Sequence, residues 1–268
     1  MSLFWTFFFA LLAAGAIAHE ATSIAIAQVT QEIATRPSDA ALYIRRARLE
    51  LEHADWQAAL IDVERADRCA TSDLNLDHER AKALLVGQRY PQALATLKTH
   101  LEVHPTDAAA RLDMARALAA MGNAAQAATN YLAGFHALPH PEPDHFMECA
   151  RLLRSAKRER DALAVLDTSA VPALAECAIE IEISLGQFDS ALARMSRLIA
   201  AAQTPEPLLA KRAALLALAG QTSASVTQWT ELQQRIQRLP PNARASNAMG
   251  RLVTQAQQAL ASLKNDSQ

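Results

Sequence analysis

The stretch HADWQAALIDVERAD, from His53 to Asp67, decides the fold because its pattern returns along the chain. It places the small residue Ala59 five positions after the turn-like Ala54-Asp55, and the large apolar Val63 follows four positions later. The same combination of a small residue, an apolar neighbour and a later large apolar residue begins at Ala93, Ala127, Ala162, Ala191 and Ser225. The intervals are 34, 34, 35, 29 and 34 residues, which predicts a repeated structural unit.

Each unit is predicted to contain two helices joined by a tight turn. A helical pattern upstream of the turn carries its own small residue, at Ala47, Ala81, Ala115, Ala150 and Ala213. Four of the seven glycines, Gly87, Gly122, Gly186 and Gly220, lie four to six residues before the second small residue. Glycine readily adopts the positive φ that ends a helix tightly, so these positions are the expected turns. Proline cannot continue a helix, and Pro37, Pro105 and Pro139 are expected to separate units.

In these features the chain resembles the tetratricopeptide repeat family, whose helix–turn–helix unit has 34 residues. The matching positions are Tyr43, Ala47, Trp56, Ala59 and Ala66 in the first unit, Leu118, Gly122, Ala127, Tyr131 and Pro139 in the third, and Phe146, Ala150, Leu153, Ala162 and Leu166 in the fourth. The fifth unit departs from the pattern, with Ile179 where a small residue is expected. The resemblance covers about residues 22–240 and implies an all-α, right-handed α-solenoid that acts as a binding scaffold and not as an enzyme.

The predicted organisation has four parts. Residues 1–18 are interpreted as a signal peptide, and residues 19–39 as an amino-terminal half-repeat that caps the array. Residues 40–240 hold six repeats, and residues 241–268 form a carboxy-terminal capping helix with Asn242 at its amino terminus. The apolar positions of this last helix follow i, i+3, i+4 spacing at Met249, Leu252, Val253, Ala256, Leu260 and Leu263.

The amino-terminal segment predicts export. Its apolar run, Leu3 to Ala18, is shorter than the roughly 20 residues that a membrane-spanning helix needs. Ala16-Ile17-Ala18 has the small-x-small form of a cleavage site, so we expect a soluble periplasmic chain that begins at His19. No Lys or Arg precedes the apolar run, which leaves an uncleaved membrane anchor as the alternative. In that case the chain would be an envelope or cytochrome assembly factor, by analogy with the family.

Composition and motifs exclude several kinds of chemistry. A formal net charge of −2 argues against a nucleic-acid partner, which needs a basic surface. No phosphate-binding glycine loop and no GxSxG nucleophile motif is present, so we expect neither a cofactor nor an enzyme. His100 and His104 are four apart, but their place at a helix end favours contact with backbone carbonyl groups, and no metal site is expected. A mature amino-terminal His19 offers one alternative, copper binding through its imidazole and the terminal amine.

The cysteines are interpreted as packing residues. Cys149 and Cys177 fall at neighbouring depths on the first helices of adjacent units, so a disulfide is geometrically possible. Free cysteines are commonly buried as small apolar residues, and this second interpretation is favoured. Cys69 then also remains unpaired.

A series of cations marks the candidate binding surface. The residue after the small residue of each first helix is Arg48, Lys82, Arg116 and Arg151 in the first four units, and Arg45 precedes Arg48 on the same helix. In the family this face looks into a groove, so the resemblance implies that these residues bind a protein or an acidic peptide. In the competing interpretation Glu79, Asp113 and Glu148, three residues earlier, neutralise the series, and only Arg48 lacks such a partner.

Overall fold

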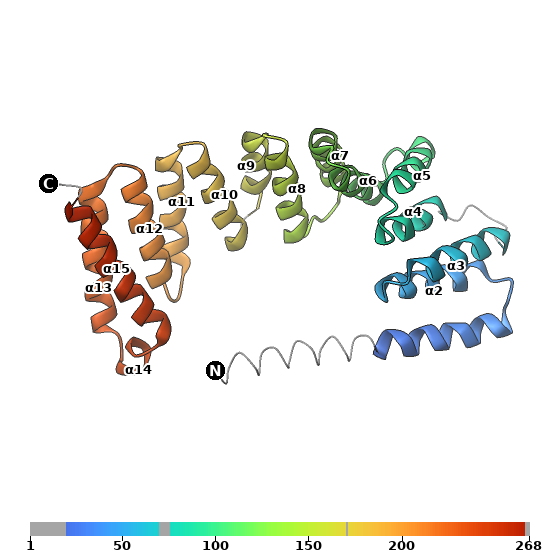
Figure 1. Ribbon diagram of the computed structural model, residues 1–268, viewed down its shortest axis with the longest axis horizontal. Helices are drawn as coiled ribbons and strands as arrows, with labels where there is room; N and C mark the ends of the chain where they lie inside the picture. Colours follow the sequence, from blue (N-terminus) through green and yellow to red (C-terminus); the bar gives the residue numbers. More distant parts are fainter. Residues whose placement is uncertain (1–19, 70–75, 170, 266–268) are drawn as a thin grey trace. The chain divides into compact units, whose positions relative to one another are not determined.

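A computed structural model describes residues 20–69, 76–169 and 171–265, and all regular structure in these ranges is α-helical (Figure 1). The predicted signal peptide, residues 1–18, and the proposed copper ligand His19 lie outside the described residues. Among the described residues, no helix is both long enough and apolar enough to span a bilayer. The chain divides into two compact units, Met1–Pro141 and Glu142–Gln268.

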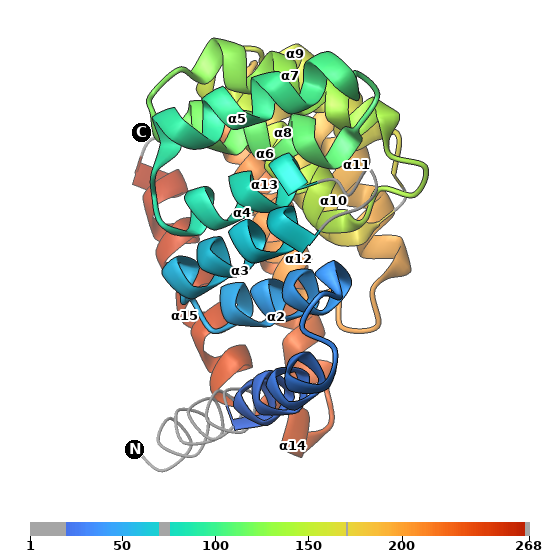
Figure 2. The same ribbon diagram turned by 90° about the vertical axis from the view of Figure 1, so that its right-hand side faces the viewer.

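The first unit consists of one helix followed by three helical hairpins. The hairpins are α2 (Ala40–Glu52) with α3 (Trp56–Cys69), α4 (Leu76–Val86) with α5 (Tyr90–Val103), and α6 (Ala108–Ala120) with α7 (Ala124–Ala137). Figure 1 and Figure 2 both show the helix over residues 20–35 beside α2. Val29 and Ile33 of this helix join Tyr43 and Ala47 in one apolar cluster, so it covers the apolar face of the first hairpin.

The second unit contains three further hairpins and a terminal helix. The hairpins are α8 (Pro143–Ser155) with α9 (Glu159–Asp167), α10 (Pro172–Ser184) with α11 (Phe188–Ala201), and α12 (Glu206–Leu218) with α13 (Thr222–Arg238). The α9 helix has nine residues where α3, α5, α7 and α11 each have 14, a difference that accounts for the short interval of 29 residues. The α15 helix (Asn247–Asn265) packs Met249 and Leu260 against Trp229 and Leu232.

The predicted start of the terminal helix is wrong. Asn242 lies inside a separate short helix, α14 (Pro241–Arg244), and α15 begins at Asn247. The side chain that meets the first turn of α15 is Ser246, whose Oγ accepts a hydrogen bond from the Met249 N–H at 3.3 Å. Asn242 and Ser246, four positions apart, both have side chains that can cap a helix, and α15 is capped by Ser246.

Six residues with positive φ fix the repeat register. They are Ala54, Gln88, Gly122, Lys157, Gly186 and Gly220, and their spacing repeats the intervals found in the sequence. The small residue five positions later is fully buried in every hairpin, at Ala59, Ala93, Ala127, Ala162, Ala191 and Ser225. Seven positions before the turn residue lies the small residue of the first helix, with Ile179 taking this place in the fifth hairpin. The register of all six units, including the irregular fifth, is therefore defined.

The expectation for Gly87 needs correction. The residue with positive φ in the second hairpin is Gln88, and Gly87 lies one position too early to form the turn. Gly87 is needed for a different reason, because a Cβ atom at this position would lie 2.5 Å from Cδ2 of Trp56. The glycine thus lets the backbone after α4 approach the indole ring of the first hairpin.

Three of the six turns hold a residue other than glycine in the left-handed conformation, which costs roughly 1 kcal/mol for most L-residues. We therefore expect Ala54→Gly, Gln88→Gly and Lys157→Gly each to raise the free energy of unfolding by about 0.5–1 kcal/mol, measured by chemical denaturation. Ala95→Gly at an exposed site within α5 is the control and should lower it by a similar amount. Destabilisation by all four substitutions would contradict the assigned turns.

Candidate functional site

Two columns of side chains define the candidate surface on the first helices. The first column is the residue six positions before each turn residue: Arg48, Lys82, Arg116, Arg151, Glu180 and Ala214. The second column is the residue nine positions before it: Arg45, Glu79, Asp113, Glu148, Cys177 and Lys211. Members of one helix are three residues apart and lie on the same helix face. The predicted cations make up most of the first column, with Arg45 at the head of the second.

In the first unit, the predicted cations are engaged by carboxylates. Arg48 donates to Glu79 Oε1 from Nε at 3.0 Å and from Nη2 at 2.6 Å. Lys82 donates to the same oxygen at 3.3 Å. Glu79 is buried, which by itself raises its pKa, but the charges and hydrogen bonds of Arg48 and Lys82 outweigh burial and lower it. The carboxylate is therefore held ionised between two hairpins.

This pairing corrects the prediction for Arg48, which was expected to lack a partner. A partner three residues away on the same helix is missing for Arg48, but Glu79 reaches it from the first helix of the next hairpin. Same-helix pairs also form, because Arg116 Nη1 lies 3.0 Å from Asp113 Oδ1. Arg45 pairs with Glu32 of the capping helix at 3.2 Å.

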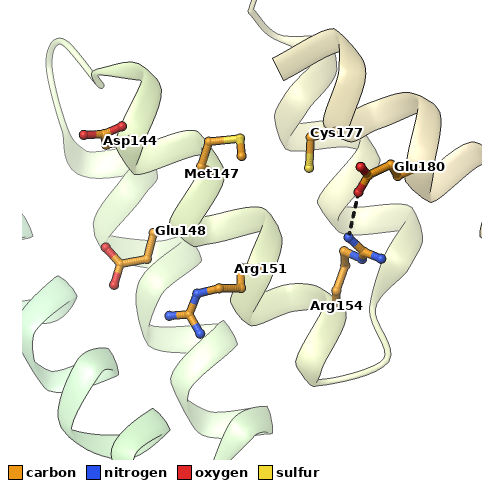
Figure 3. Close-up of a pocket in the computed structure, with 7 residues that line it drawn as sticks. All are labelled: Asp144, Met147, Glu148, Arg151, Arg154, Cys177 and Glu180. Atoms are coloured by element: carbon orange, nitrogen blue, oxygen red, sulfur yellow. Dashed lines mark ion pairs between the residues drawn. The ribbon is translucent and has the colours of Figure 1, made fainter. Parts of the chain in front are cut away.

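Arg151 in the second unit has a different environment. The place in the next hairpin that Glu79 takes relative to Arg48 is taken here by Cys177, which offers a thiol and no negative charge. Among the described residues, the exposed Arg151 guanidinium makes no hydrogen bond or ion pair. Figure 3 shows it beside the pocket, while the neighbouring Arg154 pairs with Glu180 at 3.8 Å. Arg151 is thus the member of the predicted series that is available to a ligand.

A pocket of about 620 Å³ lies between α8 and α10 around this arginine. It is lined by Asp144, Met147, Glu148, Arg151, Arg154, Cys177 and Glu180 (Figure 3). Met147 is 42% exposed and contributes apolar surface to the lining. The pocket therefore combines an exposed apolar surface with a planar, permanently charged donor.

The two cysteines near this pocket, Cys149 and Cys177, are not ionised nucleophiles at neutral pH. Burial raises the pKa of the Cys149 thiol to about 12. Burial also raises the pKa of Cys177, and Glu180 adds to this effect while Arg154 opposes it. Both thiols are therefore neutral at pH 7, when a catalytic cysteine would need to ionise. Cys69, Cys149 and Cys177 are all unpaired; Cys149 is buried as expected of a packing residue, whereas Cys177 is only half-buried.

A further set of charges lies between the two helices of a hairpin and serves the fold. In the fifth hairpin, Glu182 receives hydrogen bonds from Arg194 at 2.8 and 3.1 Å. The equivalent positions of the first hairpin hold Glu50 and Asp62, so a carboxylate faces another carboxylate. Burial, followed by the charge of Asp62, raises the pKa of Glu50 to about 7, and its Oε2 has no hydrogen-bond partner. Arg46 donates to Asp62 and lies 3.6 Å from Glu50.

Comparisons with known proteins identify the fold. No protein-family model matches the sequence, and no curated protein does. Among solved structures, the C-terminal part of a TPR repeat-containing protein from Cytophaga hutchinsonii aligns with a TM-score of 0.61 at 14% identity, covering 83% of this chain and 93% of that one. A tetratricopeptide repeat protein from Parabacteroides merdae gives 0.48 at 13% identity over 88% and 92%. MamA from Desulfovibrio magneticus gives 0.47 at 12% identity over 66% and 94%.

The contrast between Glu50 and Glu182 yields a pH-dependent prediction. The pKa of Glu50 lies above its usual value near 4.5, so the folded state binds more protons than the unfolded state between these values. The free energy of unfolding therefore falls as the pH rises from about 4.5 to 7. We expect Glu50→Gln to remove this penalty and to stabilise the protein by about 1–2 kcal/mol more at pH 8 than at pH 5.

Denaturation curves at several pH values test this expectation. Glu182→Gln is the matched control, because it removes a buried carboxylate that has an arginine partner, and it should destabilise the protein at pH 8. A Glu50→Gln protein whose stability relative to the parent does not change with pH would show that Glu50 is ionised throughout.

Proposed function

Because the chain has the tetratricopeptide-repeat fold, we propose that it is a non-enzymatic scaffold that binds an acidic segment of a partner protein at the pocket between α8 and α10. The observation that carries the proposal is Arg151, an exposed guanidinium without a charge partner among the described residues. Arginine presents a planar set of donors that matches a carboxylate in a bidentate manner, so an Asp, a Glu or a chain terminus fits it.

The apolar part of the pocket supports a peptide ligand. Met147 has an unbranched, polarizable side chain that adapts to ligands of different shapes. Its exposed surface beside Arg151 suits a segment in which an acidic residue is flanked by apolar ones. A fully polar ligand would leave this surface in water and lose the hydrophobic contribution to binding.

The other predicted cations are weaker candidates for the same role. A ligand at Arg48 would compete with Glu79, and a buried carboxylate that loses its partner is strongly destabilising. Arg45 pairs with Glu32 on the surface, where such pairs contribute only about 0.2–1 kcal/mol. A ligand could displace Glu32 from Arg45 at low cost, but breaking that pair would still reduce its binding free energy. At Arg151 no pair among the described residues has to be broken.

Export is part of the proposal and rests on residues 1–18. Cleavage after Ala18 would release the scaffold into the periplasm or the medium with His19 as its first residue. The mass of the chain purified from the native compartment decides this point. A chain that keeps residues 1–18 would instead support the membrane-anchored alternative.

Peptide selection tests the binding site directly. We expect peptides selected from a random display library to be enriched in Asp and Glu, and their affinity to fall with rising salt. Arg151→Gln should weaken a selected peptide by about tenfold to a hundredfold, because it removes charge-assisted hydrogen bonds. Fluorescence anisotropy with labelled peptide provides the dissociation constants.

Arg197→Gln is the matched control for this experiment. Arg197 is also an exposed arginine of the second unit without an ion pair among the described residues, but it lies on the second helix of its hairpin, in α11. Its replacement should leave affinity within twofold of the parent, on the order of 0.5 kcal/mol or less. Equal losses from both substitutions would mean that net charge, and not the pocket, attracts the peptide.

A further inference from the structure

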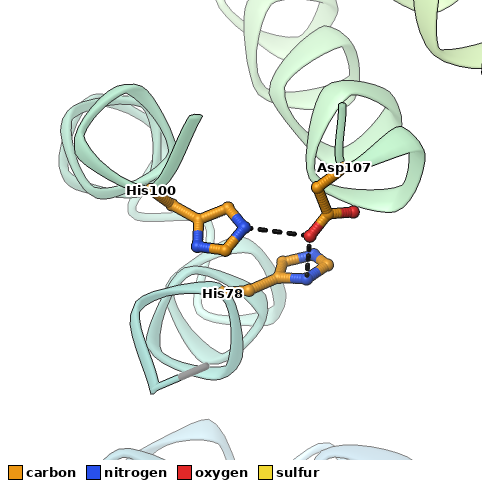
Figure 4. A group of neighbouring side chains, drawn as sticks. All are labelled: His78, His100 and Asp107. Atoms are coloured by element: carbon orange, nitrogen blue, oxygen red, sulfur yellow. Dashed lines mark hydrogen bonds and ion pairs between the residues drawn. The ribbon is translucent and has the colours of Figure 1, made fainter. Parts of the chain in front are cut away.

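Three potential metal ligands meet in the first unit, away from the pocket of the proposed function. They are His78 of α4, His100 of α5 and Asp107, the residue that precedes α6 (Figure 4). One donor atom from each lies within 4.8 Å of the other two. His78 Nδ1 is 3.6 Å, and His100 Nε2 2.9 Å, from the same Asp107 oxygen, Oδ2.

Each of the three side chains is held in place by a contact outside the group. Asp107 caps α6 with its other oxygen, Oδ1, which accepts from the Ala110 N–H at 3.1 Å and leaves Oδ2 directed at the imidazoles. His78 Nε2 lies 2.9 Å from Asp113 Oδ2, so donation to that carboxylate leaves the Nδ1 lone pair facing Asp107. The His100 ring packs against that of His104, with centroids 4.7 Å apart.

We propose that His78, His100 and Asp107 form a binding site for a divalent transition-metal ion, zinc in the first instance. Two imidazoles and one carboxylate are a common set of zinc ligands. The hydrogen bond from His78 to Asp113 is the kind of contact that fixes the tautomer of a metal-binding histidine. His100 and His104 alone gave no such expectation from the sequence, because the partner of His100 is His78, on the neighbouring helix.

The dimensions of the group fit a zinc ion with small adjustments. Ligand atoms about 2.0–2.1 Å from a tetrahedral zinc ion lie about 3.3 Å from one another. The separation of His78 and Asp107 exceeds this distance by a few tenths of an ångström, and that of His100 and Asp107 falls short by a similar amount. A zinc ion would displace the proton in the hydrogen bond between His100 Nε2 and Asp107. This proton would move to Nδ1 of His100 or to solvent.

Burial and access also suit a bound ion. His78 and His100 are 5% and 3% exposed, so few solvent molecules compete for their nitrogens. The Asp107 side chain is 21% exposed, which gives an ion a route from solvent and leaves room for a water molecule as fourth ligand.

The bound ion would join three successive elements of the first unit. Its ligands come from both helices of the second hairpin and from the start of the third. An ion that binds the folded chain and not the unfolded one stabilises the fold by mass action. We infer that zinc makes the first unit more resistant to unfolding, independently of any peptide bound to the second unit.

Zinc binding is measured on the full chain, produced without a histidine tag, stripped with EDTA and desalted. We expect calorimetry and elemental analysis after dialysis to give one zinc ion per chain. Zinc at about 100 times its dissociation constant should raise the unfolding temperature by on the order of 5–10 °C. In long-range ¹H–¹⁵N spectra of the parent chain, zinc should shift the imidazole signals of two of the eight histidines.

Conservative variants assign the ligands. Asp107→Asn keeps an oxygen that can cap α6 and removes the negative charge, and it should weaken zinc binding at least tenfold. His100→Gln should do the same. Asp113→Asn changes no proposed ligand but alters the support of His78, together with the surface pair to Arg116, and should weaken binding about tenfold. His136→Asn is the control, because this exposed histidine on α7 lies outside the group.

Two results would overturn the proposal. One is failure of the parent chain to retain zinc after dialysis, which would leave the three residues as a hydrogen-bonded network without an ion. The other is weak zinc binding that is the same in the parent, Asp107→Asn and His136→Asn, because scattered surface histidines would then explain it. The imidazole spectra of the parent decide between these interpretations even if a variant does not fold.

Discussion

Close contact between the two helices of a hairpin is the constraint on which the rest of the structure depends. A fully buried small residue lies five positions after each left-handed turn residue. In the sixth hairpin the small residue is Ser225, whose hydroxyl donates to the carbonyl oxygen of Ala213 at 2.8 Å, so side chain and backbone of the two helices touch directly. This approach leaves the large residue four positions later, such as Leu97 or Trp229, to fill the space beyond the hairpin. A larger side chain at the contact would separate the helices and displace that packing.

The same repeat geometry determines which charges are neutralised. A first-column residue of one hairpin meets the second-column residue of the next hairpin. An acid in the second column therefore neutralises the arginine of the preceding hairpin, as Glu79 does for Arg48. Where the second-column residue is Cys177, that position offers no carboxylate to offset the positive charge of Arg151 in the preceding hairpin. One change of residue type in a regular array thus makes a single arginine available to bind a ligand, without any change of backbone.

The limit of sequence reasoning follows from the range of the interactions involved. The period, the small positions and the deviating Ile179 were predictable because they depend on contacts within one helix pair of fixed spacing. The turn at Gln88 is not marked by a glycine at the turn position, because Gly87 serves contact with Trp56 instead. Arg48 and Glu79 come from different helices and lie 31 positions apart in the sequence. His78 lies 22 positions from His100 and 29 from Asp107, and these three also belong to different elements. Their meeting depends on how helices pack within a hairpin and on how hairpins stack, which a spacing rule for one helix does not contain.

The short α9 helix has a consequence for how the second unit loses its structure. It keeps Ala162 and Leu166, the contact residue and the space-filling residue, and it lacks the final five residues found in the other 14-residue second helices. In a linear array each repeat is stabilised mainly by its neighbours, so the truncated α9 weakens the coupling of its hairpin to the next one, which begins with α10. Opening fluctuations of the array should therefore begin at this junction, where amide hydrogens would exchange earlier than those of α11. A missing turn and a half of helix thereby sets a boundary between cooperative segments in a chain whose other repeats are nearly uniform.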